Sequence, residues 1–150
     1  MKIKVAWIGK TKEPAIQTLC DEYLKRISRY AEVAGLALKD ESAILSLATG
    51  DRQRQQHRER HQLVLLDSPG KQLSSEELAA FLQREQLNAV PLLFAIGAAD
   101  GFTADARRRA AFTLSLGKMT LPHELARVVL LEQLYRALTI LKNHPYHLGH

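Results

Sequence analysis

Residues 91–97 read PLLFAIG, an unbroken apolar run that ends on a glycine. LVLL at 63–66 is a second such run, and it stops at the turn-like residues 67–70, DSPG. A strand that is apolar throughout, rather than at every second residue, is typically buried on both faces by covering helices. The two runs therefore predict an α/β fold with a mostly parallel sheet flanked by helices.

Strand-like and helix-like segments alternate along the rest of the chain, with no internal repeat and no low-complexity linker. The predicted strands lie at 2–8, 33–38, 63–66, 91–97 and the start of 112–121. The predicted helices are one that opens at Glu13-Pro14, a polar one over 41–60 whose continuity at Gly50 is left open, one capped by Ser74 and Glu77, a short basic one over 104–110, and a long one from Pro122 to about Lys142. We expect one domain, 1–150, with 143–150 as a C-terminal tail.

The composition is that of an ordinary globular protein, with 46% apolar and 25% charged residues. No apolar run approaches the roughly 20 residues that a membrane helix needs, so no membrane partner is expected. The single cysteine, Cys20, cannot form an internal disulfide, which favours a reducing, cytoplasmic setting.

The chain is basic, with a formal net charge of +5 and arginines clustered in DRQRQQHRER (51–60) and ARRRA (106–110). Each cluster alone is equally well explained as a solvated helix face. Together with the net charge, the clusters indicate a polyanionic partner. Aromatic residues make up only 6% of the chain, so the sequence offers no obvious platform for stacking single-stranded bases.

The last predicted helix is apolar around most of its circumference, as its sequence HELARVVLLEQLYRALTILKN (123–143) shows. A helix of this kind has to be buried nearly all round. In so small a chain a position between two subunits meets that need, and a deeply internal position is the alternative. We therefore expect a homodimer.

In open parallel sheets, ligands bind beyond the carboxyl ends of the strands. Three predicted strand ends carry glycine or other small residues: LLDSPGK (65–71), IGAADG (96–101) and SLGKMTLPH (115–123). The chain has neither a G-x-G-x-x-G fingerprint after its first strand nor a G-x-x-x-x-G-K-[ST] loop. Binding of a dinucleotide or a nucleoside triphosphate is therefore poorly supported.

Three histidines, His144, His147 and His150, lie in the tail KNHPYHLGH (142–150). They have no carboxylate or thiolate companions nearby, and the chain has no H-x-x-x-H pair on a helix. We therefore expect no metal site, with a metal-binding tail as the alternative.

These segments, taken in order, match the motifs of one family. The matching motifs are KIKVAWIGK (2–10), EYLKR (22–26), LLDSPGK (65–71), LSSEELA (73–79), FAIG (94–97), LSLGKMTLPH (114–123), RVVLLEQLYRA (127–137) and NHPYH (143–147). On these motifs the chain resembles the ribosomal RNA large subunit methyltransferase H family. Its members are small SPOUT-class enzymes that methylate N3 of a pseudouridine in 23S ribosomal RNA.

The resemblance implies a SPOUT fold with a C-terminal trefoil knot, a homodimer, and S-adenosylmethionine as the cofactor, bound in the knot. It implies the assembled ribosome and its 23S ribosomal RNA as partners, and neither DNA nor a membrane. Carried over by position, the cofactor-binding residues are Leu66, Gly97, Leu116, Gly117, Lys118, Met119, Thr120 and Leu121.

The resemblance also implies that the tail contributes catalytic residues to the cavity of the opposite subunit. We expect His144, Tyr146 and His147 to be the catalytic residues. Either histidine acts as a general base or hydrogen-bonds the uracil edge, and Tyr146 stacks on the base or orients it. His150 lies beyond the segment that carries this expectation.

Arginines are expected to contact the RNA backbone. The expected RNA-binding residues are Arg107, Arg108, Arg109, Arg127 and Arg136, together with the run at 52–60. Arg127 and Arg136 lie among apolar residues and need a partner if buried, such as an RNA phosphate or the cofactor carboxylate. His123 either starts the last helix, the interpretation that we prefer, or forms part of the pocket wall.

One segment departs from the family pattern, which usually reads IGGPEG where this chain has IGAADG (96–101). If Ala98 replaces a glycine with a positive φ, it strains the loop by roughly 1 kcal/mol and alters cofactor affinity. The alternatives to the implied function are a SPOUT methyltransferase for another ribosomal or transfer RNA base and a catalytically silent RNA-binding relative.

Overall fold

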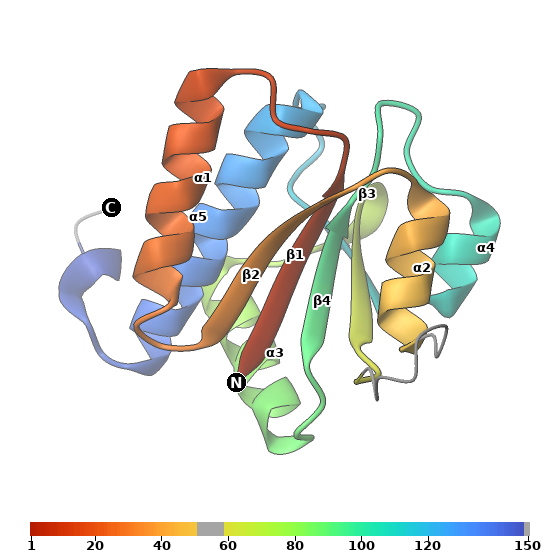
Figure 1. Cartoon of the computed structure of the whole chain (residues 1–150). Coiled ribbons are helices and arrows are strands. Elements are labelled where there is room, and N and C mark those ends of the chain that lie inside the picture. The colour runs from red at the N-terminus through yellow and green to blue at the C-terminus, as the bar shows by residue number, and fades with distance from the viewer. Residues whose placement is uncertain (51–58, 149–150) are drawn as a thin grey trace.

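A computed structural model describes residues 1–50 and 59–148 of the chain. Within these residues, five strands form one sheet in the order β2-β1-β4-β3-β5 (Figure 1). The strands are β1 (Lys2–Ile8), β2 (Glu32–Leu38), β3 (Gln62–Gln72), β4 (Leu92–Ile96) and β5 (Phe112–Ser115). Each pair of neighbouring strands is parallel, which confirms the predicted α/β fold with a parallel sheet.

Helices cover both faces of this sheet (Figure 1). They are α1 (Pro14–Ile27), α2 (Glu41–Thr49), α3 (Ser75–Leu87), α4 (Ala104–Arg109), α5 (His123–Leu141) and the short 3-10 helix η1 (Pro145–His147). One apolar cluster joins the sheet to α1, α3 and α5, and a second joins it to α2 and α4. None of the described helices is long and apolar enough to cross a membrane.

β4 lies at the centre of the sheet, and all five of its residues are buried. Phe94 and Ile96 pack into the cluster with α1, α3 and α5, whereas Leu93 and Ala95 pack into the cluster with α2 and α4. Because both faces of this strand meet helices, the run PLLFAIG needs an apolar side chain at successive positions.

α2 covers the first part of the helix that the sequence predicts over 41–60. It begins after the N-cap Asp40, whose carboxylate accepts a hydrogen bond from the N–H of Ala43, and it ends at Gly50 with a φ of 69°. A glycine in the left-handed conformation terminates a helix, so α2 stops at the residue where the sequence left the continuity of the predicted helix open. Residues 51–58, which hold most of the arginine-rich run, lie outside the described residues.

β3 continues past its predicted end at residue 66. Leu66 pairs with Leu114 of β5, and after a shift of register Lys71 pairs with the same residue. Residues 67–70, the DSPG segment, therefore form a bulge within the strand rather than a terminating turn. Gly70 permits this, because a Cβ atom there would lie 2.7 Å from the backbone carbonyl oxygen of Thr113.

α5 lies against α1 and α3 within the same subunit. Leu130, Leu131 and Leu134 on this helix are completely buried. The deeply internal position, which was the alternative to a subunit interface, therefore accounts for most of the apolar surface of α5. The apolar pattern of α5 is thus no argument for a homodimer, which stays a prediction. Leu125 at the start of α5 is still 41% exposed.

Replacing Gly70 by Ala is expected to lower the free energy of unfolding by about 1–3 kcal/mol, because the new methyl group meets the backbone of β5 rather than a flexible side chain. Ser68→Ala is the matched control in the same bulge, and its exposed side chain makes a change within about 0.5 kcal/mol the expected result. Urea denaturation measures both values. Equal stability of the two variants would contradict the close approach of the bulge to β5.

Candidate functional site

A cavity of about 510 Å³ opens at the edge of the sheet where β3, β4 and β5 end. Its walls come from the bulge in β3, the loop after β4, and the segment that leads from β5 into α5. In Figure 1 the loop after β4 stands at the upper edge of the sheet. The three strand ends that the sequence marks as ligand loops therefore meet around one space, whose size suits a small organic ligand.

Most of the predicted cofactor-binding residues line this cavity, namely Leu66, Gly97, Leu116, Gly117, Met119, Thr120 and Leu121. Lys118 does not line it, and its side chain is exposed. Met119 is 87% exposed, so the cavity is open on this side in a single chain. His123 lines the cavity and is also the first residue of α5, so both interpretations of this residue hold.

Two glycines shape the loop after β4. Gly97 is buried, and a Cβ atom there would lie 3.1 Å from the ring of Phe102. Gly101 has a φ of 76°, and its N–H donates to the carbonyl oxygen of Ala98 at 2.9 Å. Ala98 is not among the described non-glycine residues with a positive φ. The strain considered for the IGAADG segment is therefore absent at Ala98, because Gly101 takes the left-handed position.

An ion pair lies beside the cavity at the start of the bulge. Asp67 lines the cavity, and its Oδ2 accepts a hydrogen bond of 2.5 Å from Nε of Arg107 on α4. α4 is in turn fixed by Thr103, whose N–H and hydroxyl both donate to the Glu41 carboxylate at 2.8 and 2.6 Å. The rim of the cavity is thus held by contacts between α2, α4 and β3.

Asp67 and Ser68 are lining residues that the sequence reasoning missed. Both lie in the LLDSPGK loop (65–71), from which only Leu66 was taken as a cofactor residue. The available signal was their position, since polar residues directly after a buried parallel strand point to the ligand edge of the sheet.

Arg127 does not reach the surface and is 1% exposed. Its Nη1 donates to the hydroxyl of Thr11 at 2.7 Å, and its Nη2 donates to the carbonyl oxygen of Ile8 at 3.2 Å. Its guanidinium carbon lies 5.2 Å from the centre of the Trp7 ring. These contacts hold the segment after β1 against α5. The expectation that Arg127 binds RNA is therefore corrected, because a guanidinium buried in this way offers no donor to a phosphate.

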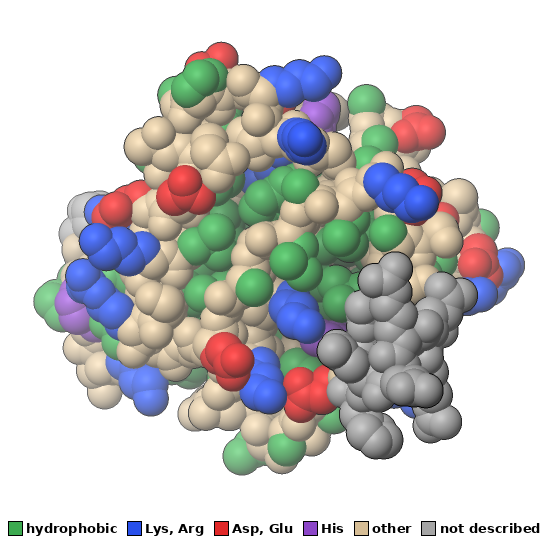
Figure 2. All heavy atoms as spheres, viewed as in Figure 1, with side chains coloured by type: hydrophobic (Ala, Val, Ile, Leu, Met, Phe, Trp, Pro, Cys, Tyr) green, Lys and Arg blue, Asp and Glu red, His purple; other side chains and the backbone are tan. Residues whose placement is uncertain are grey.

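Arg107, Arg108 and Arg109 are exposed on α4. Arg108 and Arg109 share the carboxylate of Asp105, at 3.2 and 3.3 Å. Exposed ion pairs are weak, so these guanidinium groups can exchange their partner for a phosphate. Figure 2 shows Lys and Arg side chains distributed over one face, at its edges and among the apolar side chains near its middle.

Tyr146 in the tail is held against α1 and α5 of its own chain. Its hydroxyl donates to Oε1 of Glu132 at 3.2 Å and lies 3.4 Å from the hydroxyl of Tyr23. Arg136 pairs with the same carboxylate, and its guanidinium carbon lies 5.2 Å from the centre of the Tyr146 ring. Burial, followed by the hydrogen bond with Tyr23, raises the pKa of Tyr146, so this hydroxyl stays protonated at neutral pH.

The histidines of the tail follow a sharp change of chain direction. Asn143 follows the C-cap of α5, Lys142, and has a φ of 54°, a conformation that asparagine tolerates better than most residues. His144 caps η1, since its Nδ1 accepts the N–H of Tyr146 at 3.2 Å. His147 ends η1, with an Nδ1 that is sealed from solvent and makes no hydrogen bond to the described residues. His150 lies outside those residues.

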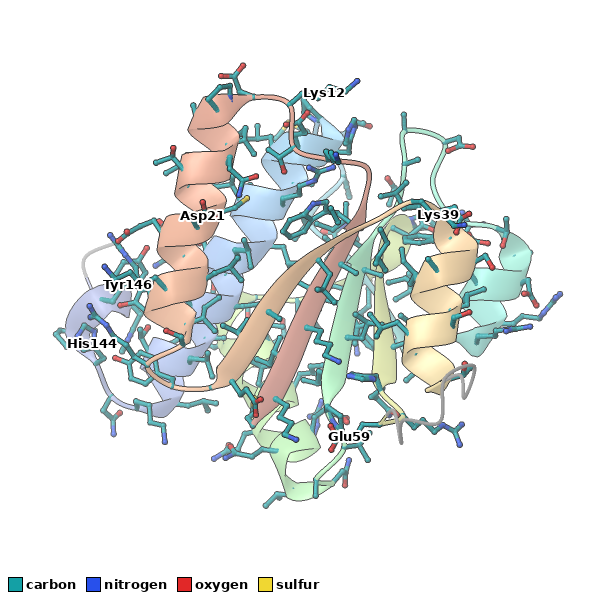
Figure 3. The ribbon with its side chains drawn as sticks, in the orientation of Figure 1. Lys12, Asp21, Lys39, Glu59, His144 and Tyr146 are labelled. Carbon is teal, nitrogen blue, oxygen red and sulfur yellow. The ribbon has the colours of Figure 1, made fainter. Side chains whose placement is uncertain are left out.

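The tail and the cavity of one chain lie at opposite ends of α5. This helix has 19 residues, so at about 1.5 Å per residue it separates His123 at the cavity from the start of the tail by about 28 Å. Figure 3 shows His144 and Tyr146 beside α1, away from the loops at the upper edge of the sheet. The structure therefore brings most of the predicted cofactor residues together but does not bring the tail to them.

Known proteins resemble this chain over its full length. The family described as "Predicted SPOUT methyltransferase" matches residues 1–147. A ribosomal RNA large subunit methyltransferase H of Koribacter versatilis is 57% identical over 151 residues, which cover 100% of both chains. The protein of the same name from Geobacter sulfurreducens is 44% identical over 98% of this chain and 99% of its own.

A solved structure shares the fold. It is the SpoU methyltransferase AviRb of Streptomyces viridochromogenes, in complex with the cofactor AdoMet, with a TM-score of 0.52 and 13% identity. The match covers 90% of this chain and 57% of the AviRb chain. With the match over residues 1–147 and relatives of such identity over their full length, the resemblance seen in the motifs is confirmed: the chain belongs to the SPOUT methyltransferase family, among the ribosomal RNA large subunit methyltransferases H.

Proposed function

We propose that this protein methylates large-subunit ribosomal RNA with S-adenosylmethionine, at N3 of a pseudouridine in the 23S RNA of assembled ribosomes. The observation that carries the proposal is the cavity, because residues assigned to the cofactor by the family pattern come from three separate strand ends and line one space. Relatives named for ribosomal RNA methylation, 57% and 44% identical, support the substrate class.

The cavity wall fits a cofactor of the nucleoside type. Leu66, Ile96 and Leu116 provide apolar surface that would enclose an adenine ring. Gly97 and Gly117 carry no side chain, so their peptide groups are accessible to the polar edge of a ligand. When bound, S-adenosylmethionine supplies a methyl group on a positively charged sulfur.

The acceptor is an imide nitrogen, which is a poor nucleophile while it is protonated. A general base with a pKa near neutrality removes this proton, and histidine suits that task. We assign the base to His144 or His147. The remaining task of the protein is to align the nitrogen with the methyl donor and to keep water out.

We assign Tyr146 a structural role instead of the catalytic role that the motif suggests. Its hydroxyl bonds to Glu132, and its ring meets the ring of Tyr135 edge-on, with 4.6 Å between centroids. These contacts favour a part in holding the tail on α5 rather than in stacking on the target base. Arg136, which pairs with Glu132, belongs to the same cluster and is assigned to it instead of to RNA.

A second copy of the chain would complete the site. A tail that starts about 28 Å from its own cavity supports a site that is shared between two subunits. Met119 and Leu125, which are 87% and 41% exposed, offer apolar surface on the open side of the cavity and at the start of α5. We infer a homodimer in which each tail serves the opposite cavity.

The RNA contacts in this proposal rest on the positive charge of α4, and the knot and the cellular location rest on membership of the family. The arginines of α4, Arg107 to Arg109, lie at the rim side of the cavity and would contact the RNA backbone. A trefoil knot in the C-terminal part and a cytoplasmic location, where ribosomes are found, belong to the same proposal.

S-adenosylmethionine is expected to raise the stability of the wild-type protein by about 2.7 kcal/mol at 100 times its Kd, because it binds the native state alone. Leu116→Trp, which fills the cavity, should lose this stabilisation, whereas His144→Ala in the distant tail should keep it. Thermal denaturation with and without ligand measures both. An unchanged response of Leu116→Trp would place the cofactor elsewhere.

The shared site predicts that two inactive variants rescue each other. Leu116→Trp and the double variant His144→Ala/His147→Ala should each lose about 100-fold or more of methyl transfer to ribosomes. After exchange of subunits in equal amounts, about a quarter of wild-type activity should return, because half of the dimers are mixed and each of these keeps one intact site. Activity that does not recover would contradict the homodimer with exchanged tails.

The nature of the acceptor is tested with ribosomes from a strain that lacks the protein. They should accept a methyl group, and mapping of the modified nucleotide should place it on N3 of a pseudouridine in 23S RNA. Transfer RNA from the same strain is the control substrate and should remain unmodified. Methylation of transfer RNA in place of ribosomes would favour the alternative within the SPOUT class.

A further inference from the structure

Asp67 differs from the other cavity-lining residues by its charge. Apart from His123, the described residues around the cavity are apolar, small or hydroxyl-bearing, and Asp67 alone among them carries a fixed charge. Its side chain is 10% exposed, so the carboxylate is largely withdrawn from water. A carboxylate in such surroundings attracts a positively charged ligand group more strongly than one in bulk solvent does.

Arg107 occupies only one of the two carboxylate oxygens. Its Nε donates to Oδ2, and among residues 1–50 and 59–148 no hydrogen bond reaches Oδ1. Oδ1 lies toward the loop after β4, 3.9 Å from the point where a Cβ atom of Gly101 would be. Gly101 also lines the cavity, so an acceptor without a donor lies between two of the cavity walls.

We propose that Asp67 binds the α-ammonium group at the amino-acid end of the cofactor, and that Arg107 is a positioning residue that orients the carboxylate. This inference rests on the proposed function, because it takes S-adenosylmethionine as the ligand. The cofactor has two positive groups, a sulfonium and an ammonium. The ammonium carries three N–H donors and the sulfonium none, so only the ammonium completes the hydrogen bonding of Oδ1.

The net charge of the pair supports the same assignment. Asp67 and Arg107 together are neutral, and the amino-acid end of the cofactor, with its ammonium and carboxylate, is neutral as well. An unpaired charge at a partly buried position is costly, and the complex of the two neutral groups contains none. Arg107, with a side chain that is 45% exposed, keeps the carboxylate aligned from the solvent side.

Calorimetric titration of the protein with three ligands tests this without any methyl transfer. S-adenosylmethionine carries both positive groups, S-adenosylhomocysteine keeps only the ammonium, and methylthioadenosine lacks the amino-acid end. Asp67→Asn should raise the Kd of the first two ligands by the same factor, about tenfold or more, because the ammonium loses its negatively charged partner. The Kd of methylthioadenosine should not change. Arg107→Gln should give the same pattern with a smaller factor, and Arg107→Lys should restore part of the loss.

Asp105→Asn is the matched control, because it removes another arginine-paired carboxylate that does not line the cavity. It should leave all three Kd values unchanged. A greater loss for S-adenosylmethionine than for S-adenosylhomocysteine would assign Asp67 to the sulfonium and overturn the proposal. An equal loss for methylthioadenosine would reduce Asp67 to shaping the cavity and would overturn the proposal as well. If the wild-type protein binds none of the three ligands, the proposed function fails and this inference fails with it.

Discussion

The parallel direction of the strands is the constraint on which the rest of the molecule depends. Because the carboxyl ends of β3, β4 and β5 share one edge, three segments that are distant in sequence meet around a single cavity. The chain leaves β5 at that edge, so α5 has to start there and run back along the sheet. The parallel arrangement that brings the cavity walls together therefore also places the tail at the other end of α5.

Local patterns predicted the elements whose cause is local. The apolar run of β4 and the capping box of Ser74 and Glu77, which the structure shows in full, are examples. β3 was predicted too short, because its second half is set by pairing with β5, a strand far along the chain. In the same way, the sequence indicates that a buried Arg127 needs a partner, but only the tertiary fold shows that Thr11 and the carbonyl oxygen of Ile8 provide it.

The candidate site also combines features that the sequence predicts with features that only the structure shows. Resemblance to a family identifies positions by motif, and most of the cofactor positions that it identified line the cavity. It does not identify the contacts that each side chain already makes, such as the hydrogen bond of Tyr146 with Glu132. Nor did it assign a role to Asp67, which lies within the motif LLDSPGK but stands out only by its charge among the residues that line the cavity.

The length of α5 sets the angular position of the tail as well as its reach. Adding one residue to an α-helix advances its end by about 1.5 Å and turns it by about 100°. An insertion in α5 would thus swing Tyr146 away from the face that carries Glu132 and Tyr23, whatever residue was inserted. Evolution can then change residues on this helix one by one, yet it has little freedom to change their number. Variation in chain length among relatives should therefore spare α5.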